Sequence, residues 1–153
     1  MIKNISNLGD AAVYCDFGKE VNKEINSNVI KYFYSIRNQK IKGINNLTPS
    51  YNKLIISFDL KLTNFNEIKK KIENLNINAN IFQNNKKIKI PVCCETIFSL
   101  DIEILEKKLL LKRDKILENF FNKEYFCYMT GFIAGMPFLG DLNKNMHTKR
   151  LET

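Results

Sequence analysis

A run of apolar residues at helical spacing lies between positions 20 and 38 and requires a folded core. Apolar side chains recur there every three or four residues, the period at which one face of an α-helix repeats. They are Val21, Ile25, Val29, Tyr32, Phe33 and Ile36. The pattern predicts a helix from Glu20 to Asn38 with one buried face. Such a face belongs to the core of a folded domain rather than to an isolated helix.

Short apolar runs bounded by turn residues predict strands on either side of this helix. A second helical repeat follows Asn64, which suits an N-cap, and ends near Asn76. The strands are expected at Ile2–Ile5, Ala11–Phe17, Ile44–Thr48, Leu54–Phe58 and Asn80–Gln83. The order strand, strand, helix, strand, strand, helix, strand predicts an N-terminal α+β domain over residues 1–84.

Residues 85–153 are expected to form a second domain that begins after a polar joint at Asn84–Lys87. Alternation from Lys87 to Cys93 predicts a half-buried strand, and Pro91 favours an edge position. Two helices and an aromatic strand should follow. Their expected ranges are Asp101–Leu111, Lys112–Asn122 and Tyr125–Thr130.

The formal net charge is +8, but the distribution of the basic residues argues against a nucleic-acid-binding protein. Such proteins concentrate Lys and Arg on one face, with Arg placed for phosphate or base contacts. Here the basic residues are mostly single lysines, and Arg37, Arg113 and Arg150 stand far apart. With 44% hydrophobic residues the chain is expected to be a soluble globular protein.

The four cysteines show no C-x-x-C spacing, which disfavours a disulfide framework or a zinc site. Cys93 and Cys127 are expected to be buried strand thiols without a catalytic role. The sequence shows no signal peptide and no apolar stretch near 18 residues, so a cytoplasmic location with reduced thiols is expected. The cysteines are Cys15, Cys93, Cys94 and Cys127.

The loop from Gly131 to Gly140 is the strongest candidate for a binding site. Its glycines permit positive φ and leave backbone amides free to face an anion or a carbonyl, while Pro137 would stiffen it. A tight corner that needs glycine for its geometry alone remains the alternative.

Side chains outside the loop give weaker signals. His147 is the only histidine and has no carboxylate near it in sequence, so it is expected on the surface. Asp10 and Asp16 flank an expected strand and are interpreted as structural. No catalytic residue and no metal ligand are predicted.

Three separated segments resemble one known family in order and spacing. The chain is similar over nearly its whole length to the B subunit of the bacterial ATP-dependent 5-oxoprolinase, also called allophanate hydrolase subunit 1 or KipI. The matching segments are Gly9-Asp10-Ala11-Ala12 with Phe17-Gly18, Ile90-Pro91-Val92-Cys93 with Phe98 and Asp101, and Gly131-Phe132 with Gly135, Pro137, Leu139 and Gly140.

The resemblance implies an α+β fold in which an N-terminal α/β sandwich domain precedes the first part of a cyclophilin-like β-barrel. It further implies a component that works with the A and C subunits of 5-oxoprolinase to hydrolyse 5-oxo-L-proline to L-glutamate. ATP with Mg²⁺ would be used by the assembled complex, without a tightly bound cofactor. The residues implied to bind substrate or nucleotide are Gly131, Phe132, Gly135, Pro137, Phe138, Gly140 and Arg150.

The chain departs from the family pattern inside the loop and at its end. Ala134, Met136, Phe138 and Asp141 replace a Pro, an aromatic residue, a Tyr and a Gly. The sequence also stops before the implied barrel would close, so the chain is expected to be inactive alone. Two other functions stay open: a non-catalytic regulator of a histidine kinase, and a carboxyltransferase-type subunit in urea or allophanate metabolism.

Overall fold

The computed structural model of the chain describes residues 1–77 and 86–149. The chain forms two compact units, Met1–Asn84 with Tyr128–Pro137, and Asn85–Cys127 with Phe138–Thr153. Helices and antiparallel strands occur together, which confirms the α+β class. The expected strand at Asn80–Gln83 and the first half of the polar joint, Asn84 and Asn85, lie outside the described residues, and the domain boundary at residue 84 stays a prediction.

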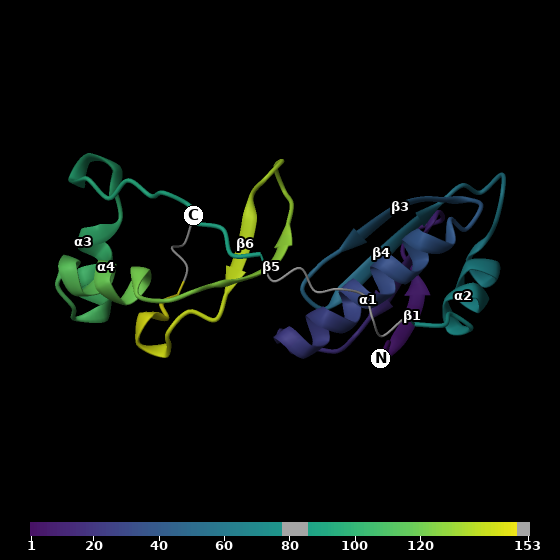
Figure 1. Ribbon diagram of the computed structural model, residues 1–153, viewed down its shortest axis with the longest axis horizontal. Coiled ribbons are helices and arrows are strands. Elements are labelled where there is room, and N and C mark those ends of the chain that lie inside the picture. Colours follow the sequence, from purple (N-terminus) through teal and green to yellow (C-terminus); the bar gives the residue numbers. More distant parts are fainter. Residues whose placement is uncertain (78–85, 150–153) are drawn as a thin grey trace. The chain divides into compact units, whose positions relative to one another are not determined.

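The first unit is built on a four-stranded antiparallel sheet (Figure 1). The strands follow the order β1-β2-β4-β3, so β1 and β3 are the edges. Cys15 pairs with Leu54 and Val13 with Ile56 in the central register. The bounds are β1 Asn4–Asn7, β2 Ala12–Asp16, β3 Ile44–Pro49 and β4 Lys53–Phe58.

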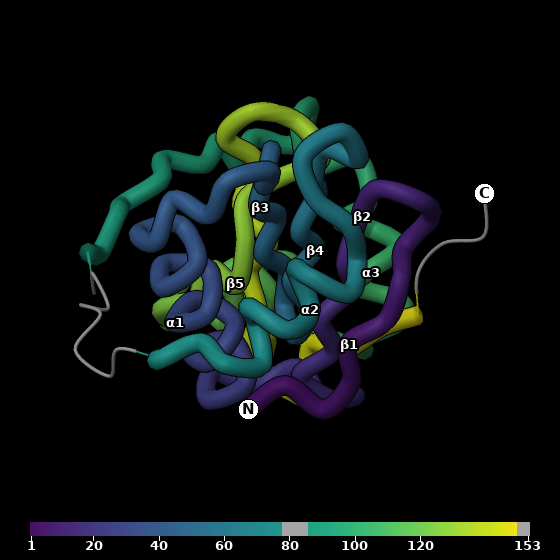
Figure 2. The backbone as a smooth tube through the Cα atoms, turned by 90° about the vertical axis from the view of Figure 1, so that its right-hand side faces the viewer, coloured from purple at the N-terminus to yellow at the C-terminus, as the bar shows by residue number. Residues whose placement is uncertain are grey.

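Two helices cover one face of this sheet, as the two perpendicular views show (Figures 1 and 2). They are α1, Lys23–Gln39, and α2, Phe65–Glu73. Every second residue of β2 and β4 is buried, because successive side chains of a strand point to opposite faces. The resulting core comprises Val13, Cys15, Phe17, Val29, Ile36, Leu54, Ile56, Phe58, Ile68 and Ile72.

Side-chain caps fix where both helices begin. Asn64 accepts a hydrogen bond from the Glu67 amide at 3.1 Å, which confirms the predicted N-cap of α2. The cap of α1 is Asn22, whose Oδ1 accepts from the Ile25 amide at 2.9 Å. The predicted start at Glu20 was therefore too early, and Val21 is 51% exposed instead of buried.

The second unit contains a helical hairpin, and both of its predicted helices are confirmed. Its buried side chains include Ile116 and Met146, whereas many apolar residues remain exposed. The helices are α3 Ile102–Leu109 and α4 Arg113–Phe121, with 3₁₀ turns at Thr96–Phe98 and Lys144–Met146.

The predicted strand at Lys87–Cys93 is wrong, since residues 86–95 form no regular element. Ile88 is 71% exposed and Val92 54% exposed, so the alternation does not produce a buried face. A strand needs a partner for its backbone groups, and Pro91 lacks one donor. None of the described strands pairs with this segment. Cys93 is consequently exposed, which corrects its expected burial.

Candidate functional site

The glycine-containing segment forms the turn of a β-hairpin. Its strands are β5, Phe126–Thr130, and β6, Pro137–Gly140, and they pair with each other. The aromatic strand was predicted, but β6 was expected to be part of the loop. Residues 131–137 belong to the first unit.

Three backbone hydrogen bonds close the turn. The Gly131 amide donates to the Met136 carbonyl at 3.1 Å, and the Met136 amide donates to the Ile133 carbonyl at 3.2 Å. The Ile133 amide donates to the Gly131 carbonyl at 2.8 Å. By contrast, the amides of Phe132, Ala134 and Gly135 have no hydrogen-bond partner within the described residues. These three donors are available to a carbonyl or an anion.

Phe132 is the aromatic residue of this turn, between β5 and β6. Its side chain is 91% exposed, and its φ of 67° lies in the left-handed region that a bulky residue rarely adopts. Gly135 has a φ of 80°, and a Cβ built on it would meet nothing within 4 Å. Gly135 therefore serves the backbone conformation rather than a close approach. The turn therefore combines an exposed aromatic ring with a backbone conformation that is unusual for a bulky residue.

Asn26 anchors the hairpin to the first unit. This α1 residue is only 2% exposed. The two N–H groups of its Nδ2 are shared among the carbonyls of Ser50 at 3.2 Å, Tyr51 at 3.0 Å and Tyr128 at 3.1 Å. One buried amide thus joins α1, the β3–β4 turn and β5. Sequence reasoning missed Asn26, although a polar residue beside the apolar positions Ile25 and Val29 of a predicted helix was an available signal.

Two further contacts hold the same strand. The Ser50 hydroxyl lies 3.4 Å from Met129 Sδ, and the rings of Tyr51 and Tyr128 lie 5.8 Å apart between centroids. The β3–β4 turn therefore contacts two successive residues of β5. These contacts hold β5 directly before the turn begins at Gly131.

Asp16 has the structural role that the sequence favoured. Lys53 Nζ forms an ion pair with it, and the Gly18 amide donates to Asp16 Oδ1 at 2.7 Å. The hydrogen bond from Lys53 lowers the pKa of Asp16, while partial burial opposes this and the Gly18 amide adds to it. Lys53 Nζ also donates to the Gly18 carbonyl at 2.6 Å. The ion pair and the two hydrogen bonds to Gly18 hold the chain where β2 ends.

The remaining candidates do not assemble into a catalytic cluster. His147 is exposed, as predicted, and its Nε2 lies 3.1 Å from the Leu142 carbonyl. Burial raises the pKa of the Cys15 thiol to about 12, so this thiol is not a nucleophile. Cys127 is exposed, so its expected burial was wrong. Over residues 1–77 and 86–149 no three His, Cys, Asp or Glu side chains gather as a metal site would require.

The predicted site residues are thus only partly brought together. The six predicted residues between Gly131 and Gly140 all lie in the β5–β6 hairpin. Those up to Pro137 are assigned to the first unit, and Phe138 and Gly140 to the second. Arg150 lies outside the described residues. In the part of the chain that the structure describes, no helix has the length and apolar character that crossing a bilayer needs.

Two curated relatives are both named as the B subunit of 5-oxoprolinase. The protein from Bacillus subtilis (strain 168) is 28% identical over 158 residues, which cover 95% of this chain and 66% of the relative. The protein from Haemophilus influenzae (strain ATCC 51907 / DSM 11121 / KW20 / Rd) is 25% identical over 157 residues, or 98% of this chain and 70% of the relative. The chain therefore spans about two thirds of the length of these relatives. They confirm the resemblance that the sequence motifs indicated.

A solved structure shares the fold. The crystal structure of TTHA0988 matches with a TM-score of 0.79 at 19% identity, over 94% of this chain and 28% of that chain. The family described as carboxyltransferase domain, subdomain C and D, matches residues 3–153. Because this match extends over nearly the whole chain, the protein belongs to the carboxyltransferase domain family, subdomains C and D.

Proposed function

We propose that the chain acts as the B component of an ATP-dependent 5-oxoprolinase, which hydrolyses 5-oxo-L-proline to L-glutamate together with its A and C subunits. The names of both curated relatives support this assignment. ATP with Mg²⁺ is used by the assembled complex, which works in the cytoplasm. The chain alone is inactive.

The hairpin turn is the part of the site that this chain contributes. Opening the lactam converts a planar carbonyl into a tetrahedral centre with a negatively charged oxygen, which oriented N–H donors stabilise. The single observation that carries this role is the set of three amides without partners, at Phe132, Ala134 and Gly135. Substrate or nucleotide contacts are assigned to Gly131, Phe132, Gly135, Pro137, Phe138, Gly140 and Arg150.

The second unit is the first part of a cyclophilin-like barrel that another polypeptide segment covers. Large exposed apolar side chains support this proposal, since water disfavours such surface in a finished domain. Leu100 is 85% exposed, Ile97 71% and Phe98 63%. A covering segment would remove these side chains from water.

Co-expression of the chain with candidate A and C subunits tests the assignment. Purified complex is assayed for glutamate formed from 5-oxoproline, with and without ATP. ATP-dependent glutamate that requires this chain supports the proposal. If the three chains assemble without activity, the chain is a truncated component. If they do not assemble and a histidine kinase co-purifies instead, the regulatory function replaces the enzymatic one.

A matched pair of variants tests the hairpin separately. Phe132→Asn removes the exposed ring, and Asn tolerates the left-handed backbone. Leu60→Asn removes a 59% exposed apolar side chain elsewhere in the first unit and serves as the control. The Phe132 variant should lose at least about tenfold in activity, equal to about 1.4 kcal/mol of transition-state stabilisation. Equal activity of the two variants would exclude the Phe132 ring from the site.

The family description favours one second candidate, a carboxyltransferase-type subunit in urea or allophanate metabolism. That reaction needs a biotin carboxylase partner, which lactam opening does not. Carboxyl transfer to urea by the chain with such a partner, without glutamate formation from 5-oxoproline, would favour this candidate.

A further inference from the structure

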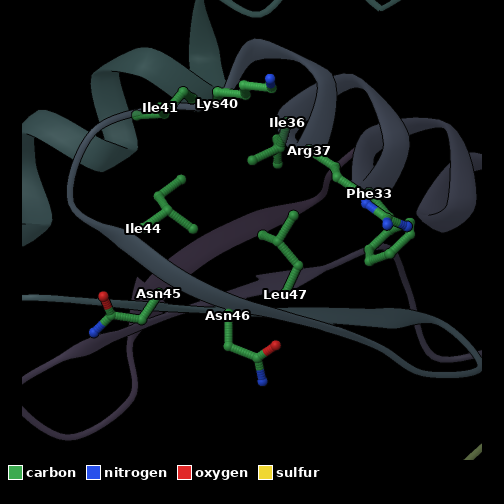
Figure 3. A pocket seen from close by; sticks show the side chains of 9 residues that line it. All are labelled: Phe33, Ile36, Arg37, Lys40, Ile41, Ile44, Asn45, Asn46 and Leu47. Carbon is green, nitrogen blue, oxygen red and sulfur yellow. The ribbon is translucent and has the colours of Figure 1, made fainter.

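A pocket of about 310 Å³ lies between the C-terminal half of α1 and the edge strand β3 (Figure 3). It belongs entirely to the first unit and is separate from the hairpin turn. A volume near 300 Å³ is at the lower end of the range for small-molecule sites. The lining residues are Phe33, Ile36, Arg37, Lys40, Ile41, Ile44, Asn45, Asn46 and Leu47.

The interior of the pocket is apolar. Ile36, Ile44 and Leu47 point toward one another from the helix and the strand (Figure 3). Ile36 is 1% exposed, whereas Ile44 and Leu47 are half-buried and therefore keep surface for a ligand. Phe33 and Ile41 flank them and are half-buried as well. A small apolar group placed there would remove this surface from water.

Two cations stand at the rim, and no acidic residue lines the pocket. Arg37 and Lys40 are one helical turn apart, and both are exposed. Neither forms an ion pair with another described residue. The Arg37 guanidinium lies 5.9 Å from the centroid of the Phe33 ring, which orients it beside the apolar interior. The rim is therefore suited to an anion.

The connection between α1 and β3 is fixed before any ligand arrives. The Lys40 amide donates to the Arg37 carbonyl at 3.3 Å, and the Ile44 amide donates to the Ile41 carbonyl at 3.2 Å. The Asp59 amide donates to the Gly43 carbonyl at 2.8 Å. A preformed wall lowers the entropy lost on binding.

The edge strand is poorly suited to pairing with a peptide. The register of β3 against β4 shifts between Ile44 and Asn46, so that Asn45 is an extra, unpaired residue. Such a bulge kinks an edge and disfavours the addition of another strand. The features together favour a small molecule over an extended peptide.

We propose that this pocket binds a small monocarboxylate with an apolar body, such as a short branched or aromatic carboxylic acid. The apolar body contacts Ile36, Ile44 and Leu47, and the carboxylate lies at the rim, where the exposed side chains of Arg37 and Lys40 supply positive charge. The proposal does not depend on lactam hydrolysis, because it concerns other residues and a ligand without a lactam.

The test uses the whole chain labelled with ¹⁵N and titrated with phenylacetate, with phenylacetamide as the uncharged probe of the same shape. Chemical shifts of the pocket amides should change with a dissociation constant on the order of a few millimolar, as expected for about ten non-hydrogen atoms. Phenylacetamide should bind at least about fivefold more weakly, because it lacks the charge.

Two double variants complete the test. Arg37→Gln with Lys40→Gln should weaken phenylacetate binding about tenfold, since exposed ion pairs contribute up to about fivefold each. Lys31→Gln with Lys42→Gln removes the same charge from residues that do not line the pocket, and it should leave binding unchanged. Equal binding of the two probes, equal effects of the two variants, or shifts confined to another part of the chain would overturn the proposal. Circular dichroism confirms that each variant is folded.

Discussion

The side-chain amide of Asn26 donates to the main-chain carbonyl of Tyr128 at 3.1 Å, across 102 positions of the sequence. The same nitrogen contacts the carbonyls of Ser50 and Tyr51, so one side chain serves three backbone acceptors. Buried polar groups are costly unless they are hydrogen-bonded. Asn26 therefore couples the stability of the first unit to the position of the candidate binding turn.

Replacing Asn26 should loosen the hairpin as well as lower stability. Asn26→Ala leaves buried carbonyls without their donor and should cost about 2–3 kcal/mol in the free energy of unfolding. Asn26→Asp should cost more, because a carboxylate would face the same carbonyls. Urea unfolding measures both values, and hydrogen exchange of the Gly131 amide reports the hairpin. The exposed Asn38→Ala on the same helix should change stability by less than about 0.5 kcal/mol.

The Asp16–Lys53 ion pair should give the protein a specific acid sensitivity. The pKa of Asp16 is lowered by the hydrogen bond from Lys53, so the folded state holds the ionised form more strongly than the unfolded state does. The resulting contribution to folding stability is fully present above the ordinary pKa of Asp, about 3.9, and is lost as the pH falls through the lower pKa of folded Asp16. Asp16→Asn should therefore cost about 1 kcal/mol at pH 7 and nearly nothing near pH 2.

Urea unfolding of the wild type and of Asp16→Asn at pH 7, 5, 3 and 2 measures this difference. Asp10→Asn is the control, since Asp10 is exposed and forms no ion pair among the described residues. A stability difference for Asp16→Asn that stays constant down to pH 2 would show that the ion pair is not its cause.

Thiol labelling should separate the cysteines by burial. Cys15 is fully buried and its pKa is raised to about 12, so iodoacetamide at pH 8 should modify it only after unfolding. Cys93 and Cys127 are exposed and should be modified in the folded protein. Peptide mass spectrometry before and after adding urea shows which cysteines are modified in the folded and in the unfolded protein. Labelling of Cys15 at the rate of Cys93 in the folded chain would contradict the burial of Cys15 in the core between the sheet and its two helices.

Local patterns predicted the first unit well because its elements obey local rules. The alternation in β4 and the helical period in α1 each mark a buried face, and Asn64 caps α2 through its own side chain. The segment Lys87–Cys93 has the same alternation but no partner strand, and pairing depends on residues far away in sequence. The anchoring role of Asn26 also depends on such distant residues. Sequence reasoning could therefore find the turn that begins at Gly131, but neither the strand Pro137–Gly140 nor the support that Asn26 gives.

The role of Gly43 also depends on a residue far away in sequence, Thr63. The φ of Gly43 is +93°, and a Cβ there would lie 2.7 Å from Thr63 Cγ2. Thr63 is 7% exposed and its hydroxyl lies 2.9 Å from Glu67 Oε2, so it cannot easily move away. Gly43→Ala should cost about 2–4 kcal/mol, from the backbone strain and the overlap together. Gly9→Ala, with φ +60° and nothing within 4 Å, should cost about 1 kcal/mol from strain alone.

A double-mutant cycle separates the two causes at Gly43. Thr63→Ser removes the Cγ2 methyl group but keeps the hydroxyl that contacts Glu67. In that background Gly43→Ala should cost at least about 1 kcal/mol less than in the wild type, because the closest contact is gone while the φ is unchanged. Urea unfolding of the four proteins gives the coupling energy. If the two substitutions were additive, the contact with Thr63 Cγ2 would have no part in the cost at Gly43.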